Sequence, residues 1–376
     1  MKKLRVMVLY GGRSGEHEVS LRSGASVMRQ LDREKFDILP VAIDKQGRWL
    51  LSEISSFGSL DSALSIPADA TPVTLRTYPA KDGRGELIEL QADSSGSLKT
   101  IPFDVAFPVM HGPLCEDGTL QGLLELAEVA YVGCGVLASS VGMDKEVAKR
   151  LARDAGIPMV PYISVKSGKQ DWSVLASRVG RELGYPAFVK PANMGSSVGV
   201  HRVRSESELR PALEDAFRYD TKVLIERSVS AREIELSVLE NREFGGAPRV
   251  SVPGEIIPRH EFYSYEAKYL DDNGAALLIP AKLDPSQVKL AQDMALKAFS
   301  ALECEGMARC DLFLDKNTGE FFFNEVNTIP GFTSISMYPK MWEASGISYP
   351  ALLTELVELA VARQKRKRAL LHEFGR

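Results

Sequence analysis

The sequence predicts a mixed α/β protein with two or three domains, and three observations support this. A chain of 376 residues is too long for one ordinary hydrophobic core. Residues 4–10 form a continuous apolar run, as a buried parallel strand would, and a glycine-rich turn and a segment with helical spacing follow. Runs of strand length and helix length alternate along the rest of the chain, which is typical of α/β domains.

The composition excludes several classes of protein. The apolar fraction of 44% and the charged fraction of 26% describe a globular protein in water. The net charge is −4 and the chain has no basic stripe, so nucleic acid is not an expected partner. No apolar stretch is long enough to span a membrane, and no membrane association is expected. The N-terminal apolar run is short and lacks a small-residue cleavage site, so we expect a strand there rather than a signal peptide.

The four cysteines point to a reducing compartment. Cys115, Cys134, Cys304 and Cys310 form neither a CxxC pair nor a zinc-binding spacing with histidine. We therefore expect reduced thiols in a cytoplasmic protein. A basic run at 363–368 follows the last predicted helix, and its simplest interpretation is charge that suits a helix C-terminus.

The first predicted domain covers residues 1–137. Further strands are expected at 36–43 and 104–109, where apolar runs recur. Residues 45–100 are rich in Ser, Ala and Pro and contain hairpin-like runs, so we interpret them as an elaboration of this domain.

Two loops of this domain could bind ligands. The turn after the first strand does not have the G-x-G-x-x-G spacing, but it precedes a helix N-terminus, which suits a small anionic or polar ligand. On local sequence alone, interaction with the helix dipole is the better explanation of Glu16 in this turn. His111 follows a strand end, where ligands of open α/β sheets usually bind. A helix is expected near 118–129, capped by Asp117 or Thr119.

The second predicted domain covers residues 138–227 and the third covers 228–376. The second opens with an amphipathic helix, MDKEVAKRLARDAGIP, and contains strands around a glycine- and serine-rich loop. The third contains strands, a polar-aromatic segment at 259–274 and two helices. A long segment without regular structure is often a lid or a binding loop.

The loop after Lys190 has the composition of a phosphate-binding loop. Gly195, Ser196, Ser197 and Gly199 can present successive backbone N–H groups to an anion, and Lys190 can add a point charge. The spacing is not that of a Walker motif. A polar hairpin turn with a solvated lysine explains the same residues equally well.

An acidic hairpin is expected between Gly306 and Asn327. A three-residue loop, 317–319, with Gly319 in the left-handed conformation would place Asp311 opposite Glu325. Because side chains alternate along a strand, Arg309 and Asn327 would then share that face. The side-chain oxygen atoms of Asp311, Glu325 and Asn327 are ligands that Mg²⁺ prefers. An ordinary ion pair of Arg309 and Asp311 on a solvent-exposed face is the alternative.

Three further segments carry candidate binding groups. Glu226, Arg227 and Glu233 lie around a strand edge that could face adenine and ribose, although an exposed linker explains them locally. Lys268 in the 259–274 segment could bind phosphate or a carboxylate. After the hairpin, a glycine loop with Ser334 and Ser336 could hold a carboxylate.

In this order, these segments resemble the ATP-grasp superfamily, and within it the D-alanine–D-alanine ligases. The matching stretches are GGRSGEHEVS, MHGPLCEDGTLQG, MDK, VKPANMGSSVGV, VLIERSV with Glu233, YEAKYL, ARCDLFL and NEVNTIPGFTSIS. They cover nearly the whole chain. The resemblance implies three ATP-grasp domains, with an N-terminal parallel-sheet domain and the nucleotide held between the central and C-terminal domains.

The resemblance also implies a set of site residues. Those expected to bind ATP are Lys145, Lys190, Ser196, Ser197, Glu226, Arg227, Val229, Glu233, Phe262, Lys268, Asn324 and Glu325. Two Mg²⁺ or Mn²⁺ ions would be held by Asp311, Glu325 and Asn327. The groups expected to take part in catalysis are Glu16, Ser196, Tyr269, Arg309, Gly331 and Ser336. Those expected to bind the acceptor substrate are His111, Lys268, Ser334 and Ser336.

The implied activity is ATP-dependent ligation of two D-alanine molecules through an acyl phosphate, for peptidoglycan synthesis. A cytoplasmic homodimer is the corresponding expectation. A tyrosine at 269 in the YEAKY context favours D-alanine over D-lactate as acceptor. Arg227 stands where lysine is frequent and Cys115 where glycine is frequent, and both differences are expected to be mild. D-Alanyl-D-lactate or D-alanyl-D-serine synthesis, another ATP-grasp carboxylate–amine ligase, a small-molecule kinase and a nucleotide sensor are the alternatives.

Overall fold

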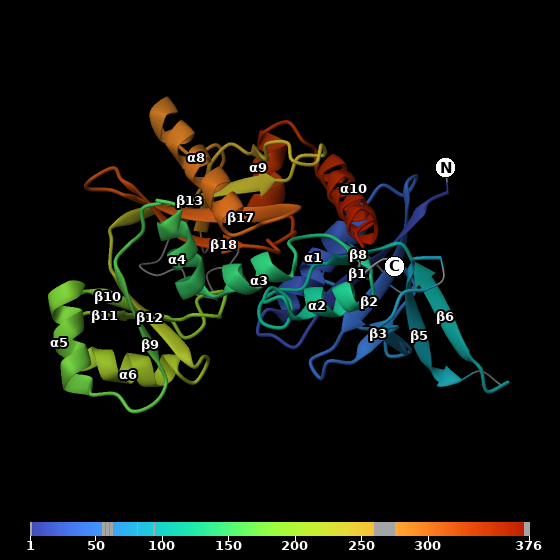
Figure 1. The fold of residues 1–376 in the computed structure, drawn as a ribbon, viewed down its shortest axis with the longest axis horizontal. Coiled ribbons are helices and arrows are strands. Elements are labelled where there is room, and N and C mark those ends of the chain that lie inside the picture. Colours follow the sequence, from blue (N-terminus) through green and yellow to red (C-terminus); the bar gives the residue numbers. More distant parts are fainter. Residues whose placement is uncertain are drawn as a thin grey trace.

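The computed structural model describes residues 2–258 and 275–371, except 55–56, 58–59, 61–62, 81 and 93–94. This part of the chain forms three β-sheets of eight, four and six strands, with helices packed against them. The four-stranded sheet forms a lobe at one end of the molecule together with α5 (Trp172–Glu182) and α6 (Glu206–Ala216) (Figure 1). The predicted mixed α/β class is confirmed.

The parallel part of the first sheet matches the predicted apolar runs. It consists of β1 (Leu4–Gly11), β2 (Phe36–Ile43), β7 (Val105–Pro108) and β8 (Ala130–Tyr131), and β1 lies between β2 and β7. These strands read as nearly continuous apolar sequence because both faces of a parallel sheet are buried.

The 45–100 elaboration adds four strands to the edge of the same sheet. They are β3 (Trp49–Leu51), β4 (Thr71–Leu75), β5 (Gly85–Ala92) and β6 (Leu98–Phe103), each antiparallel to its neighbour. The hairpin expected in this segment is β5–β6. Its effect is to extend the sheet beyond β2 (Figure 1).

The first three helices differ from the sequence prediction in two details. They are α1 (His17–Gln30), α2 (Thr119–Leu126) and α3 (Val136–Met143). The helix expected at 118–129 is shorter, and its N-cap is Gly118, without a side-chain cap. Asp117 instead accepts hydrogen bonds from the N–H groups of Leu114 and Thr119, at 2.8 and 3.0 Å, and so shapes the preceding loop. Helix α3 was not expected.

The second sheet is antiparallel throughout, in the order β11-β10-β12-β9. Its elements are α4 (Lys145–Asp154), β9 (Tyr162–Lys166), α5 (Trp172–Glu182), β10 (Ala187–Pro191), β11 (His201–Val203), α6 (Glu206–Ala216) and β12 (Lys222–Arg227). Helix α4 and the strands around the glycine- and serine-rich loop agree with the prediction, and α5 was not expected.

The third sheet has β13 beside β17 at its centre, followed by β18. Its strands are β13 (Ala231–Leu239), β14 (Arg249–Val250), β15 (Gly254–Pro258), β16 (Ala275–Leu278), β17 (Met307–Asp315) and β18 (Phe321–Asn327). The helices of this part are α8 (Pro285–Ala301), α9 (Met337–Ala344) and α10 (Tyr349–Arg368). The domain boundaries at 137/138 and 227/228 stay a prediction.

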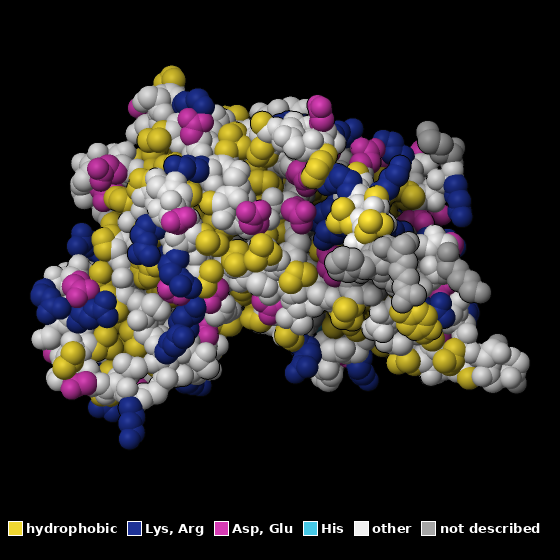
Figure 2. Space-filling model, in the orientation of Figure 1, with side chains coloured by type: hydrophobic (Ala, Val, Ile, Leu, Met, Phe, Trp, Pro, Cys, Tyr) yellow, Lys and Arg dark blue, Asp and Glu magenta, His cyan; other side chains and the backbone are white. Residues whose placement is uncertain are grey.

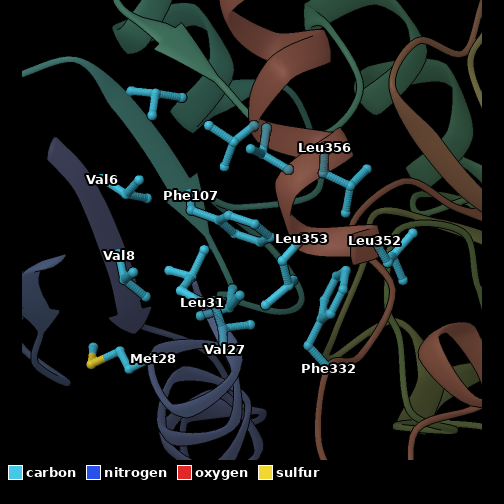
Figure 3. Packing of buried hydrophobic residues seen from close by; sticks show 14 of the residues in the cluster. Val6, Val8, Val27, Met28, Leu31, Phe107, Phe332, Leu352, Leu353 and Leu356 are labelled. Carbon is cyan, nitrogen blue, oxygen red and sulfur yellow. The ribbon is translucent and has the colours of Figure 1, made fainter. Parts of the chain in front are cut away.

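Helix α10 returns to the first sheet at the end of the chain. Leu352, Leu353 and Leu356 are at most 1% exposed and share a core with Phe107 of β7 and Val8 of β1. In Figure 3 the leucines of α10 lie on one side of Phe107 and the valines of β1 on the other. The two ends of the sequence therefore form one core.

The surface is of mixed charge. On the face shown in Figure 2, basic and acidic side chains are interspersed, in keeping with the net charge of −4. The basic end of α10 contacts acids of neighbouring elements: Arg366 lies 3.5 Å from Glu240, and Lys367 pairs with Glu125. In the described part of the chain, no helix combines the length and apolarity needed to cross a membrane.

We expect Leu353→Ala to destabilise the whole protein, because Leu353 is fully buried between α10 and the first sheet. A cavity of this kind typically costs about 2–5 kcal/mol. The denaturant midpoint should fall clearly. Leu126→Ala is the matched control, since Leu126 is 71% exposed and should change the midpoint little. Equal shifts for the two variants would contradict the shared core.

Candidate active site

The β17–β18 hairpin brings the predicted acidic residues together. Asp311 pairs with Glu325, and Arg309 pairs with Asn327, as the sequence analysis expected. Opposed residues of an antiparallel pair point to the same face, so the four side chains share one side of the sheet. Asp311 is 9% exposed, which makes this a largely buried polar face rather than a solvated one.

The turn of this hairpin differs from the expectation. The N–H of Asp315 donates to the carbonyl of Glu320 at 2.9 Å, so four residues form the loop instead of three. Gly319 does have the expected left-handed backbone, with a φ of 73°. A longer loop alone would shift the register by one residue.

A β-bulge compensates for the longer loop. Leu312 pairs with Phe323 and Asp311 pairs with Glu325, so Asn324 is the extra residue of β18. Phe323 faces the core at 0% exposure, whereas Asn324 and Glu325 are both half-buried. The bulge thus restores Glu325 to the position opposite Asp311.

Arg309 is the basic group nearest to this acidic face. It binds Asp311 through two hydrogen bonds, from Nε to Oδ1 at 2.8 Å and from Nη2 to Oδ2 at 2.7 Å. Its Nε also lies 3.0 Å from Oε2 of Glu235 on β13. Burial alone would lower the pKa of Arg309, but the charges of Asp311 and Glu235 raise it well above its ordinary value. Asn327 Nδ2 donates to Asp311 Oδ2 at 2.9 Å.

Lys145 connects the hairpin to the glycine- and serine-rich loop. It is the first residue of α4, which Asp144 caps by accepting hydrogen bonds from two backbone N–H groups at 3.1 Å. Lys145 Nζ lies 3.3 Å from Oε2 of Glu325 and donates to the carbonyl of Met194 at 2.7 Å.

A second basic group lies at the end of β10. Lys190 Nζ is 2.7 Å from Oε2 of Glu226 on β12 and 3.3 Å from Oδ1 of Asn324. Lys149 of α4, which is fully buried, lies 3.1 Å from the other oxygen of Glu226. Burial would raise the pKa of Glu226, but the two lysines outweigh it and lower that pKa.

The loop after Lys190 has unusual backbone geometry. Ser196 and Ser197 have positive φ values of 52° and 60°, and Gly199 has a φ of 67°. Left-handed backbone costs a non-glycine residue roughly 1–2 kcal/mol. Such strain is often found at ligand-binding segments, but anion binding by this loop stays a prediction.

The same loop meets the first domain at Glu16. Ser196 Oγ donates a short hydrogen bond to Glu16 Oε1. A Cβ atom at Gly112 would lie 2.6 Å from Glu16 Oε2, and one at Gly195 would lie 3.1 Å from it. The carboxylate therefore fits closely between two glycines, and a larger side chain at Gly112 would displace it.

His111 lies beside this carboxylate in a buried cluster. Its Nδ1 is 3.5 Å from Oε1 of Glu116, and its Nε2 is 3.0 Å from Oγ of Ser23. Burial would lower the pKa of His111, but its interaction with Glu116 and the charge of Glu16 outweigh burial and raise it.

The loop after the hairpin holds two of the predicted residues close together. Ser336 Oγ accepts from the N–H of Thr333 at 2.9 Å, and a Cβ at Gly331 would lie 2.7 Å from that oxygen. Ser334 is exposed. The two serines thus differ in environment, and Ser336 alone lies against Gly331.

The predicted adenine and ribose groups are only partly brought together. Glu226 is buried beside the lysines, and Val229 and Glu233 are half-buried. Arg227 is exposed, and its guanidinium donates to the carbonyls of Leu183 and Glu182 at 3.2 Å, at the end of α5. Phe262, Lys268 and Tyr269 lie outside the described residues.

Three charged residues of this region were not identified from the sequence: the buried Lys149 and Glu235, and the half-buried Glu116. Lys149 stands four residues after Lys145 on one helix, a spacing that places both on one face. Glu235 stands opposite Asp311 on β13, but that pairing requires the strand order of the sheet. Of these two observations, only the helical spacing of Lys145 and Lys149 can be made from the sequence.

The oxygen atoms on the acidic face of the hairpin suit a divalent metal ion. No group of three or more His, Cys, Asp or Glu that could hold a metal occurs within the described residues. The predicted set has two carboxylates and one amide on one face, which is the usual protein contribution to a magnesium site completed by phosphate and water. The residues therefore fit a hard divalent cation that is shared with a phosphate ligand.

The three sheets, and the lysines and carboxylates that meet between them, define an enzyme of the ATP-grasp class. Two family models match: one described as "D-ala D-ala ligase N-terminus" at residues 5–134, and one described as "D-ala D-ala ligase C-terminus" at residues 151–358. The chain belongs to the D-alanine–D-alanine ligase family. Membership implies the use of ATP and a divalent metal ion.

Individual relatives are similar to this chain over nearly its full length. A protein of Bradyrhizobium diazoefficiens named D-alanine–D-alanine ligase A is 54% identical over 373 residues, which is 98% of both chains. Among solved structures, the D-alanine–D-alanine ligase of Coxiella burnetii is 36% identical with a TM-score of 0.82, covering 98% of this chain and 97% of that one. The VanG D-Ala:D-Ser ligase of Enterococcus faecalis is 34% identical with a TM-score of 0.81, covering 96% and 100%.

We expect Glu116→Gln to lower the pKa of His111, because the substitution removes a negative charge that favours the imidazolium form. The measurement is an NMR titration of the His111 ring protons, assigned by comparison with His111→Gln. Asp215→Asn, which removes a carboxylate 2.8 Å from His201 in another part of the chain, is the control variant and should leave the pKa of His111 unchanged. A constant or increased pKa for His111 would contradict this electrostatic assignment.

Proposed function

We propose that this protein joins two D-alanine molecules to D-alanyl-D-alanine with ATP, releasing ADP and phosphate, as a step of peptidoglycan precursor synthesis. One observation carries the proposal: Glu16 of the first sheet's domain meets Ser196 of the loop beside Lys145, next to the acidic hairpin. Groups suited to binding an ammonium, a phosphate and a metal ion thus lie next to one another in space, in that order, across the domains. The names of the full-length relatives support the choice of substrate.

Nucleotide binding is assigned to the groups between the second and third sheets. In this proposal Lys145 and Lys190 hold the phosphates, since both are largely buried cations beside the acidic hairpin. The remaining assigned residues are Ser196, Ser197, Glu226, Arg227, Val229, Glu233, Phe262, Lys268, Asn324 and Glu325. Because Arg227 points to the end of α5, we assign it a role through its backbone.

Metal binding is assigned to Asp311, Glu325 and Asn327, which would hold two Mg²⁺ or Mn²⁺ ions. The bound ions would neutralise charge on the transferred phosphoryl group. Arg309 must then share Asp311 with a metal ion, and its contact with Glu235 leaves it a second carboxylate partner. This arrangement keeps the guanidinium in place when the charge around Asp311 changes.

The chemistry requires groups of these types. A carboxylate is a poor acyl donor, so the first D-alanine is phosphorylated before its carbonyl carbon is attacked by the amine of the second. Glu16 would bind the ammonium of the first D-alanine. Arg309 and the N–H of Gly331 would stabilise the tetrahedral oxyanion, a role in which preorganised donors are especially effective. A closing segment would exclude water, and the 259–274 segment with Tyr269 is assigned to this role.

The acceptor D-alanine is assigned to a neighbouring subsite. Ser336, Ser334 and Lys268 would bind its carboxylate, and His111 would lie near it. The position of His111 supports this assignment, because the charges that raise its pKa include that of Glu16, the group assigned to the first D-alanine.

A ligase that uses D-serine as acceptor is the second candidate, because the VanG D-Ala:D-Ser ligase covers nearly the whole chain. A competition assay with D-alanine, D-serine and D-lactate as acceptors at neutral pH distinguishes these activities. The homodimer implied by the resemblance is a separate proposal, which light scattering of the purified protein tests.

With D-alanine, ATP and Mg²⁺ alone, we expect ADP, phosphate and D-alanyl-D-alanine in equal amounts. Mass spectrometry identifies the dipeptide, and a phosphate assay gives the stoichiometry. Phosphate without dipeptide would reject the ligase, and a stable phosphorylated product without free phosphate would indicate a kinase.

We expect Arg309→Ala to lower turnover about 10²–10³-fold, the typical cost of losing one oxyanion donor, with a much smaller effect on ATP binding. Steady-state kinetics and calorimetric ATP titration measure the two quantities. Arg232→Ala is the matched control, since Arg232 binds Glu255 with two hydrogen bonds of 2.8 Å in the same sheet but has no assigned role. Equal losses in turnover and ATP affinity would show that Arg309 acts in binding.

A further inference from the structure

Lys149 is a fully buried lysine that none of the roles above uses. It lies on α4, and its side chain is 0% exposed. A buried ammonium is costly unless it is paired, so its retention in the interior requires a compensating interaction. Burial lowers the pKa of Lys149, and the charge of Glu226 opposes this shift.

Glu226 is shared between two lysines. Lys149 lies 3.1 Å from Oε1, and Lys190 lies 2.7 Å from Oε2. One carboxylate therefore faces two ammonium groups. The two lysines are not equivalent, because Lys190 is 11% exposed and also contacts Asn324, whereas Lys149 is enclosed.

Lys149 also touches the acidic hairpin. Its Nζ donates to the carbonyl of Phe323 at 3.4 Å, directly before the bulge at Asn324. Phe323 N–H in turn donates to the carbonyl of Pro158 at 2.8 Å. The ammonium thus holds the strand segment that leads to Asn324 against the carboxylate on β12.

We propose that Lys149 is the permanent counter-ion of Glu226, which allows Lys190 to exchange this carboxylate for a nucleotide phosphate. If Lys190 left Glu226 without Lys149, a buried carboxylate would stay uncompensated, and that cost would be subtracted from the binding of ATP. With Lys149 in place, the exchange leaves Glu226 neutralised. Lys149 is therefore a positioning residue that acts through Lys190, and the inference rests on the nucleotide site of the proposed function.

Lys149→Met tests this directly, with calorimetric titration of ATP and of adenosine in the absence of D-alanine. We expect at least a tenfold loss of ATP affinity and a clearly smaller loss for adenosine, which has no phosphate to draw Lys190 away. Arg150→Met is the control, because Arg150 is the next residue of α4 but 54% exposed, and it should change neither affinity. Equal losses for ATP and adenosine, or an unchanged ATP affinity, would overturn the proposal.

A second comparison separates this role from simple loss of structure. In Glu226→Gln the carboxylate that needs a counter-ion is gone, so adding Lys149→Met should change ATP affinity less than threefold. The double variant removes the acid and its enclosed counter-ion together, and it carries the test if Lys149→Met alone does not fold. A further tenfold loss in the double variant would contradict the proposal. Because no ligation is measured, a failure of dipeptide synthesis would leave these results intact.

Discussion

The compensation of buried carboxylates is the constraint on which the site depends. Asp311, Glu226 and Glu235 are each less than a tenth exposed, and each has a basic partner from another element or strand position. An unpaired charge in such a place would cost several kcal/mol. The sheets and α4 must therefore approach one another in the arrangement that pairs these groups. The same proximity creates a concentrated set of lysines, arginine and carboxylates that suits nucleotide chemistry.

The first domain contributes its carboxylate through a rigid frame. Ser20 of α1 accepts from the N–H of Gly11 and donates to the carbonyl of Val109, both at 2.7 Å, so the helix is fixed to two strand ends. Arg363 of α10 donates to the carbonyls of Tyr131 and Gly133 at 2.7 Å, which attaches the last helix to the same sheet. Because α10 is part of this core, the first and third sheets keep a fixed relation. Glu16 is thereby held in the position where Ser196, from the loop after Lys190, donates its hydrogen bond.

Much of the fold could be predicted from the sequence, because apolar runs and turn residues show strands directly. The pairing of Asp311 with Glu325 was also correct, but the assumed geometry contained two errors that cancel. The loop has four residues rather than three, and Asn324 is bulged. The run from Phe321 to Phe323 is uniformly aromatic, so it gives no alternation from which to locate a bulge. Only the pairing of the folded strands shows that Asn324 is the extra residue and that Glu325 lies opposite Asp311.

Lys149 shows where prediction from the sequence must stop. A lysine on an amphipathic helix normally faces water. The four-residue spacing places Lys149 on the same helix face as Lys145, but it does not show that Lys149 is buried. Its burial follows from the packing of α4 against β18, which brings it to a carbonyl and a carboxylate more than seventy positions away in sequence. Sequence thus shows which groups can carry charge, whereas the number of cations that share one carboxylate is a property of the fold. Because two lysines share Glu226, one of them can bind a ligand while the other keeps the buried carboxylate paired. With a single lysine at this place, ligand binding would leave the carboxylate buried without a counter-ion.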